Sequence, residues 1–389
     1  MRVAAPGALL VLIMAQPNMA TGMMPYYRHA WALAPLLITV IFAAYLFALT
    51  PTLSLLGTPP TREGWWWRIA LGSTCGIGAD LAMALAHSAW LACLARICAG
   101  LSVGLVTGSL AGLILERRGE RGRTALATAT VFGSALGTFA AAALAQYLPA
   151  PGVTVYLVHA ITLGLATLVV LSDRGVRPAA VERGTAHAPA ADEPPLAGYL
   201  TGIAAWVSAG LVVALLPSYG AELLGTRNLM LLALPVTLYL VCAWLAQRAL
   251  PPRVLPAEPV AAQLIIIAGV AIAAAVSWAP SLPLLLCGGA VAGCGQGIAY
   301  RTGLRIVSAA ATPDRHARIA SRFAAVAYLC AAVGTVALGV VATVGSMRDA
   351  VLAAAVVLAG ITLATLIIRR RAMRRAATPT PVSQTSTIA

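Results

Sequence analysis

The chain has 389 residues, of which 60% are hydrophobic and 10% are charged, and its mean hydropathy is +0.88. Soluble domains carry about 25% charged residues, so this composition excludes a soluble globular protein and indicates a polytopic membrane protein. All 26 basic residues are arginines, and the formal net charge is +14. Because the arginines are scattered over short loops and one tail, we assign them to membrane topology and anionic lipid, and expect no nucleic-acid partner.

Twelve apolar stretches have lengths near the roughly 20 residues that a membrane-spanning helix needs. They cover residues 4–24, 30–53, 68–87, 89–115, 124–147, 153–172, 197–219, 228–249, 260–279, 283–309, 320–343 and 349–368. Such long runs predict helices rather than barrel strands, which have about ten alternating residues. The first stretch is also compatible with a signal peptide cleaved near residues 18–20, which would leave eleven spans.

The arginines are distributed unevenly between the two sides of the predicted membrane. If the N-terminus is cytoplasmic, the outer loops hold only Arg28, Arg227 and Arg348. The positive-inside rule therefore places both termini in the cytoplasm. We expect an N-terminal half at 1–175, a cytoplasmic linker at 176–196, a C-terminal half at 197–370 and a basic, then disordered tail at 371–389.

A ladder of glycines four residues apart occurs twice, 189 residues apart, in the fourth and the tenth apolar stretches. Its members are Gly100, Gly104, Gly108, Gly289, Gly293 and Gly297. Glycines at this spacing share one helix face and allow two helices to approach closely in lipid. We therefore predict an all-α polytopic membrane protein with twelve transmembrane helices in two pseudo-symmetric six-helix halves, in which the ladders pack helices.

Two ionisable residues lie well inside the predicted spans, where charged groups are usually functional. Asp80 and Arg96 are each eight residues from the predicted turn near residue 88, so both should lie about 12 Å below the outer surface. An ion pair between them would keep Asp80 ionised, and its opening would favour proton uptake, which suits proton coupling. The alternatives are a static structural pair or two side chains that face different ways.

Several other polar and aromatic residues fall within the spans. Gln16 and Asn18 flank Pro17, which can free backbone groups for other partners. His159 is isolated in the sixth span, and we interpret it as a packed, hydrogen-bonded residue. We predict a substrate cavity lined by Gln16, Asn18, Arg96, Trp206, Gln296 and Tyr300.

Signatures of other chemistry are missing from the sequence. The seven cysteines lie inside the predicted spans without metal-ligand spacing, so we expect neither a metal site nor a disulfide. There is no phosphate-binding loop and no catalytic cluster. We therefore expect no cofactor, no enzymatic activity and no ATP-driven transport by this chain.

The predicted architecture resembles the major facilitator superfamily, whose members have two parallel six-helix halves. Gly57, Arg62 and Gly64 match its cytoplasmic gate motif Gly-x-Leu-Ala-Asp-Arg-x-Gly, although Thr61 replaces the aspartate. Residues 94–104 resemble its fourth-helix motif, whose arginine, here Arg96, is implicated in proton coupling in antiporters. Residues 133–141 resemble its fifth-helix antiporter motif, with threonine in place of the proline.

The resemblance implies a bacterial multi-pass transporter of the plasma membrane. We expect a proton-coupled exporter, an efflux antiporter, that moves a small amphipathic molecule by alternating access through a cavity lined by helices one, four, seven and ten. The chain should act as a monomer, with its substrate, protons and membrane lipid as partners. The alternative is an importer of a sugar, amino acid or organic acid. A membrane transferase and a non-transporting sensor are more distant alternatives.

Overall fold

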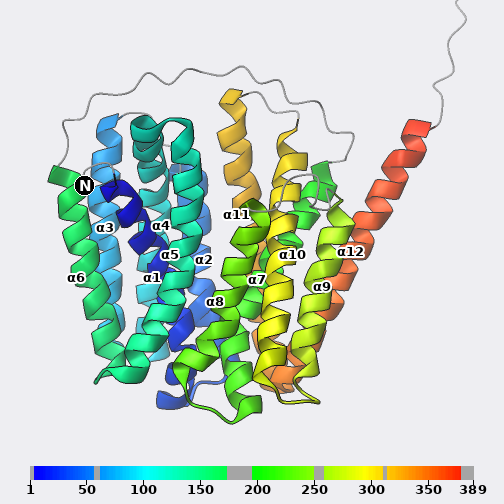
Figure 1. Cartoon of the computed structure of the whole chain (residues 1–389), viewed down its shortest axis with the longest axis horizontal. Coiled ribbons are helices and arrows are strands. Elements are labelled where there is room, and N and C mark those ends of the chain that lie inside the picture. Colours follow the sequence, from blue (N-terminus) through cyan, green and yellow to red (C-terminus); the bar gives the residue numbers. More distant parts are fainter. Residues whose placement is uncertain (1–3, 57–61, 173–194, 249–257, 310–312, 378–389) are drawn as a thin grey trace, which may run out of the picture.

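The computed structural model describes residues 4–56, 62–172, 195–248, 258–309 and 313–377, and within them the chain forms twelve α-helices (Figure 1). The first six are α1 (Ala5–Ala30), α2 (Pro35–Leu56), α3 (Arg62–Ala84), α4 (Ala89–Arg118), α5 (Glu120–Tyr147) and α6 (Pro151–Ser172). The other six are α7 (Pro195–Leu224), α8 (Leu229–Arg248), α9 (Pro259–Ala275), α10 (Leu282–Ser308), α11 (Pro313–Val344) and α12 (Met347–Ala377). The twelve-helix prediction is confirmed.

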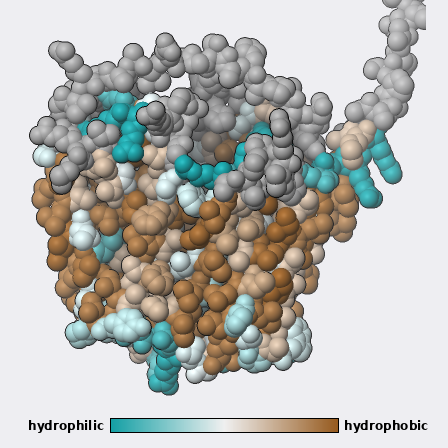
Figure 2. Space-filling model, viewed as in Figure 1, coloured by the Kyte–Doolittle hydropathy of each residue, from teal (hydrophilic) through white to brown (hydrophobic). Residues whose placement is uncertain are grey.

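The helices have the length and surface of membrane spans. Ten of the described helices are long and apolar enough to cross a membrane, and α9, with 17 residues, is a shorter apolar helix. Apolar side chains cover the flank of the bundle between hydrophilic upper and lower rims (Figure 2). Ile161 and Leu168 on α6 and Val356 on α12 are each more than half exposed. An exposed apolar surface of this extent is suited to lipid and not to water.

Several helices extend beyond their predicted spans, among them α1 and α12. Helix α1 continues to Ala30 through Pro25, because neighbouring helices can supply partners for the backbone groups that a proline frees. Helix α12 continues through the arginines at 369–371 to Ala377, because alanine and arginine are both strong helix formers. The expected linker and the rest of the tail lie largely outside the described residues, which omit 173–194 and 378–389.

The two halves repeat the same packing pattern. In the N-terminal half, α1 packs on α5, α2 and α3 pack on α4, and α3 packs on α6. In the C-terminal half, α7 packs on α11, α8 and α9 pack on α10, and α9 packs on α12. The halves meet through α2 with α11 and through α5 with α8, which are equivalent pairs. Helix α1 begins and α12 ends at the same end of the bundle (Figure 1).

The glycine ladders lie at equivalent helix contacts. A Cβ atom added at Gly100 would lie 2.5 Å from the carbonyl oxygen of Tyr45, and one at Gly104 would lie 2.5 Å from Thr52 Cγ2, both on α2. On α10, a Cβ at Gly289 would lie 2.6 Å from the Pro235 carbonyl oxygen on α8. Gly293 and Gly297 lie equally close to α8, where an added Cβ would overlap the carbonyl oxygens of Tyr239 and Ala243. Each ladder thus brings the fourth helix of its half against the second.

We expect Gly293→Ala to destabilise the protein by about 1–3 kcal/mol, because its new methyl group would overlap backbone that cannot move aside. Thermal unfolding of the detergent-solubilised variant should show a lowered melting temperature. Gly360→Ala on α12 is the control, since nothing lies within 4 Å of an added Cβ there. Equal melting temperatures for the two variants would show that α8 and α10 do not pack this closely.

Candidate functional site

Helix α1 is held near its centre by hydrogen bonds to three neighbouring helices. Gln16 reaches α3, the carbonyl oxygen of Leu12 lies beside His159 of α6, and the carbonyl oxygen of Pro17 accepts a hydrogen bond from Arg96 of α4. Pro17 has no N–H group, so the helix lacks one of its own hydrogen bonds at this position. The neighbouring helices therefore hold α1 where its internal ladder is weakest.

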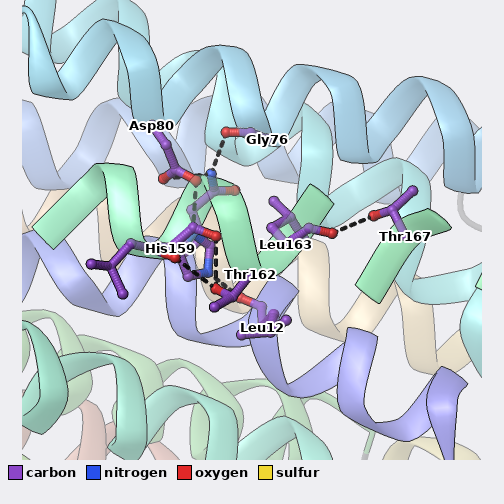
Figure 3. A network of polar contacts seen from close by, with 9 residues as sticks. Leu12, Gly76, Asp80, His159, Thr162, Leu163 and Thr167 are labelled. Atoms are coloured by element: carbon purple, nitrogen blue, oxygen red, sulfur yellow. Dashed lines mark hydrogen bonds and ion pairs between the residues drawn. The ribbon is translucent and has the colours of Figure 1, made fainter. Parts of the chain in front are cut away.

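Asp80 on α3 and His159 on α6 form a buried hydrogen-bonded pair (Figure 3). Nδ1 of His159 lies 2.7 Å from Oδ2 of Asp80, and Nε2 lies 3.0 Å from the carbonyl oxygen of Leu12. Nε2 of Gln16 donates to Oδ1 of Asp80 at 2.9 Å and to the carbonyl oxygen of Gly76 at 2.5 Å. The side chains of Asp80 and His159 are only 1% and 7% exposed.

The predicted ion pair between Asp80 and Arg96 does not form. Asp80 faces α1 and α6, whereas the guanidinium of Arg96 lies between α1 and α2. The depth of a residue in the membrane follows from counting residues along its helix. The neighbour that its side chain faces depends on how the surrounding helices are arranged. The alternative in which the two side chains face different ways is therefore the observed one. His159, the partner of Asp80, was identifiable from the sequence only as the one histidine in the sixth span.

Arg96 is a buried cation without a carboxylate partner among the described residues. Its Nη1 donates to the Pro17 carbonyl oxygen at 2.6 Å, and its Nε donates to the Ile41 carbonyl oxygen at 3.3 Å. Its Cζ atom lies 4.9 Å from the centroid of the Tyr45 ring, within the range of a cation–π interaction. The side chain is 2% exposed, and Nη2 has no hydrogen-bond partner among the residues that the structure describes. One donor of this guanidinium is therefore unused.

The C-terminal half contributes a group of aromatic side chains. The ring centroid of Trp206 on α7 lies 4.2 Å from that of Tyr328 on α11 and 6.2 Å from that of Tyr300 on α10, and both contacts are edge-to-face. Gln296 lies one helical turn from Tyr300 on the same face of α10 and hydrogen-bonds to no described residue, although it is 7% exposed. Nε1 of Trp206 is likewise buried without an acceptor.

The six predicted cavity residues thus fall into two groups. Trp206, Tyr300 and Gln296 lie together in the C-terminal half. In the N-terminal half, Gln16 turns toward α3, Arg96 contacts α1 and α2, and Asn18 donates to the Met14 carbonyl oxygen of its own helix. Tyr45 and Tyr328 could not be predicted as neighbours of these groups, because nothing in the sequence indicates that α2 and α11 pack together.

Two sequence motifs resemble those of the major facilitator superfamily, the gate motif and the fifth-helix motif, and the structure describes the first only in part. Of the gate motif, Gly57 and Thr61 lie outside the described residues, Arg62 begins α3, and Gly64 lies in its first turn. Of the fifth-helix motif, Gly133 and Gly137 pack against the α1 backbone at Val11 and Ala15. The small residues of α5 therefore bring it close to the same central part of α1 that carries Gln16.

At the outer end, an ion pair and hydrogen bonds join the two halves. Nη2 of Arg28 on α1 lies 3.0 Å from Oε2 of Glu222 on α7. The Leu36 N–H donates to Thr343 at 2.8 Å, and the Leu229 N–H donates to Gln146 at 2.8 Å. Arg28 and Glu222 border a cavity of about 700 Å³ between α1, α7 and α8. Arg248 donates to Thr128, and Ser321 to the Leu53 carbonyl oxygen, at the opposite end.

No group of three or more His, Cys, Asp or Glu residues in the described parts of the chain is arranged to hold a metal ion. The seven cysteines, all in described helices, are free thiols. The described part of the interior therefore offers hydrogen-bond donors and acceptors, the buried cation of Arg96 and an aromatic group. These elements suit reversible binding of an organic molecule or a proton.

No protein-family model matches the sequence, and no curated protein matches it. Solved structures do match. A mutant of the nucleoside transporter NupG superposes with a TM-score of 0.75 at 12% identity, covering 95% of this chain and all of that one. A bacterial homologue of the human lysosomal transporter Spinster, inward-facing and occupied, has a TM-score of 0.70 at 13% identity, covering 97% and 98% of the two chains.

A bacterial homologue of the human drug peptide transporters PepT1 and PepT2 has a TM-score of 0.69 at 11% identity, covering 96% of this chain and 98% of that one. At these identities the similarity concerns the fold, and it extends over nearly the whole chain. Together with the repeated packing of the two halves, it shows that this multi-pass membrane protein has the fold of the major facilitator superfamily.

Proposed function

We propose that this chain is a secondary active transporter that exports a small amphipathic molecule in exchange for protons by alternating access. The observation that carries the proposal is a set of buried polar groups that have no partner in the described parts of the chain, above all Arg96 Nη2 and Trp206 Nε1. A buried donor without an acceptor costs about 1–3 kcal/mol, so a purely structural bundle would not retain several of them. A transporter interior needs such donors, because its substrate supplies the missing acceptors.

The chemistry of the aromatic group favours a planar substrate. Trp206, Tyr300 and Tyr328 present ring edges and faces in contact with each other, which can accept a further ring by stacking or edge-to-face contact. Nε1 of Trp206 donates only, whereas the amide of Gln296 can both donate and accept. A planar aromatic or heteroaromatic molecule with polar edges meets both requirements. The solved structures with this fold include a nucleoside transporter and a bacterial homologue of human drug peptide transporters.

Arg96 is suited to recognise an acceptor or anionic group of the substrate. Its charge is uncompensated by any described carboxylate, and its two used donors bind carbonyl oxygens of α1 and α2. Tyr45, on which the guanidinium lies, is on α2, and α2 packs along α11, which carries Tyr328. The ring beneath the cation and one ring of the aromatic group therefore lie on α2 and α11, which meet where the two halves join.

The principal test is transport by the purified chain in proteoliposomes. An imposed pH gradient should drive accumulation of one or more members of a panel of planar aromatic amines, nucleosides and aromatic carboxylates. Export in exchange for protons predicts that the compound accumulates on the side that the protons leave. Import together with protons predicts that it accumulates on the side that the protons enter. No gradient-driven flux for any class in the panel would contradict the proposal and favour a non-transporting role.

Trp206→Phe should raise KM for the transported compound about 2- to 10-fold, because one aromatic contact of about 0.5–1.5 kcal/mol is weakened. Gln296→Leu should raise KM without lowering the melting temperature, because Gln296 has no hydrogen bond to lose. The matched controls are Trp90→Phe, at a side chain that is 77% exposed on α4, and Gln263→Leu, at an amide that binds Thr365. Equal effects of the Trp206 and Trp90 changes would argue against the aromatic site.

Arg96→Met should abolish transport while leaving the melting temperature unchanged or higher. An unpaired buried charge is costly, and its replacement by an apolar side chain of similar length is often neutral or stabilising. The carbonyl oxygens of Pro17 and Ile41 keep their places in helices α1 and α2. A marked fall in melting temperature, measured in detergent, would instead identify Arg96 as a structural residue.

The outer ion pair should control how readily the extracellular side opens. Glu222→Arg places two cations opposite each other, and we expect it to favour the outward-open state and to lower the flux. The charge exchange Arg28→Glu with Glu222→Arg should restore flux to near the wild-type value. Because the pair is 28% and 45% exposed, its contribution is at most about 1 kcal/mol, so the expected change is several-fold. Failure of the double exchange to restore flux would exclude a gating role for the pair.

A further inference from the structure

We propose that Asp80, His159 and Gln16 form a proton-binding site that holds one proton in the described conformation and releases it when α1 moves. The binding of the proton follows from geometry alone. Its use in transport rests on the proposed function. The site belongs entirely to the N-terminal half, on α1, α3 and α6, and it includes neither Arg96 nor the aromatic group.

The number of bound protons follows from the two neighbours of the His159 ring. Nε2 lies 3.0 Å from a carbonyl oxygen, which only accepts, so Nε2 must carry a hydrogen. Nδ1 lies 2.7 Å from Asp80 Oδ2, and this contact also requires a hydrogen between the two atoms. That hydrogen resides either on Nδ1, facing a carboxylate, or on the carboxyl group, facing a neutral ring. Both forms hold one proton more than a neutral histidine beside an ionised aspartate.

Loss of this proton is incompatible with the observed contacts. A neutral His159 has a single N–H group, so it can donate a hydrogen bond either to Asp80 or to the Leu12 carbonyl oxygen, but not to both. In either case a lone pair would face an oxygen at hydrogen-bond distance. The site would also carry a net charge of about −1 in a buried, low-dielectric place, which is unfavourable without a new partner. The described conformation is therefore the proton-loaded one.

The site is closed to water in this conformation. His159 borders a cavity of about 130 Å³ between α1, α5 and α6, but apart from His159 and Thr162 its lining is apolar. The Thr162 hydroxyl is bonded within its own helix, to the carbonyl oxygens of Val158 and His159. Apolar cavities of this kind stay dry. The proton can therefore leave only after the helices around the site have moved apart.

Few other titratable groups surround the pair. Helix α5 carries none between Ala125 and Gln146, and α1 presents Gln16 and the Leu12 carbonyl oxygen to the pair. The titratable groups on the packed helices around this core include the Tyr27 and Tyr156 hydroxyls, which bind each other at 2.9 Å, the thiols of Cys75, Cys93 and Cys98, and the guanidinium of Arg96. None of them contacts Asp80 or His159 through a hydrogen bond, so the proton is shared by these two residues alone.

The position of the site connects the proton to the motion of α1. Gln16 and the Leu12 carbonyl oxygen both belong to α1 and lie just before Pro17, where the helix lacks one of its own hydrogen bonds. Deprotonation breaks one of the hydrogen bonds that His159 makes, and it leaves a net negative charge on the Asp80–His159 pair beside this segment of α1. The same segment carries the carbonyl oxygen that Arg96 binds. A change of protonation at Asp80 and His159 is thereby transmitted to the buried cation through α1.

The test measures the protonation of His159 directly. The full chain, labelled with ¹⁵N-histidine and embedded in lipid nanodiscs, is studied by solid-state NMR between about pH 5 and about pH 9, the range around histidine titration. His159→Gln identifies the His159 signals, and His29→Gln, at an exposed histidine on α1, is the control. We expect a ring hydrogen-bonded at both nitrogens, with a shared proton that is lost at the alkaline end.

Asp80→Asn distinguishes a proton site from a structural pair. The asparagine keeps the shape and can donate to Nδ1, so the protein should fold, but His159 should then stay neutral throughout the range. The melting temperature of the wild type should fall as the pH rises and the extra proton of the folded state is lost, whereas that of Asp80→Asn should not. A neutral His159 beside an ionised Asp80 at every pH would overturn the proposal.

Flux measurements separate this proposal from the proposed function. If the wild type transports a panel compound in response to a pH gradient, Asp80→Asn should retain downhill flux and lose the pH-driven part. Unchanged pH-driven flux in Asp80→Asn would overturn a role for the site in coupling. If His159 titrates as expected but the wild type shows no flux, the proton site stands and the transport function fails.

Discussion

The interior of this protein is governed by the lack of hydrogen-bond partners in the hydrocarbon core. Every polar group placed there must find its partner within the bundle. In the N-terminal half, the acceptors include the carbonyl oxygens of Leu12 and Pro17 on α1 and the carboxylate of Asp80 on α3. His159 of α6 and Arg96 of α4 reach the two carbonyl oxygens, and Gln16 of α1 donates to Asp80. The charged groups of the half are thus organised around a single helix.

Such an arrangement requires helices that approach one another closely. Glycines provide the necessary space, since α4 packs on α2, α10 on α8, and α5 on α1 with glycine at each contact. A side chain at these positions would separate the helices and place the carbonyl oxygens of α1 out of reach. The glycine ladders therefore support the fold in both halves and, in the N-terminal half, the site as well.

The two halves share packing but not chemistry. At the offset of the ladders, Asp80 corresponds to Gly269, which packs against Ala292, and Arg96 corresponds to Leu285, which is fully buried. The C-terminal half instead places Trp206, Tyr300 and Tyr328 on its inner helices. Charge in one half and aromatic surface in the other suit a bundle in which one half binds protons and the other contributes most of the contacts to an organic molecule.

The membrane class, the twelve helices and the duplication could be predicted from the residues, because apolar length and glycine spacing are local properties. Asp80, Arg96, Trp206 and Tyr300 could also be singled out in this way. Which of these residues meet depends on how the helices pack. Residue counting set similar depths for Asp80 and Arg96, but the direction of each side chain depends on the surrounding helices. The partnership of Asp80 with His159, 79 residues away, and with Gln16 on α1 therefore appeared only once the helices were packed.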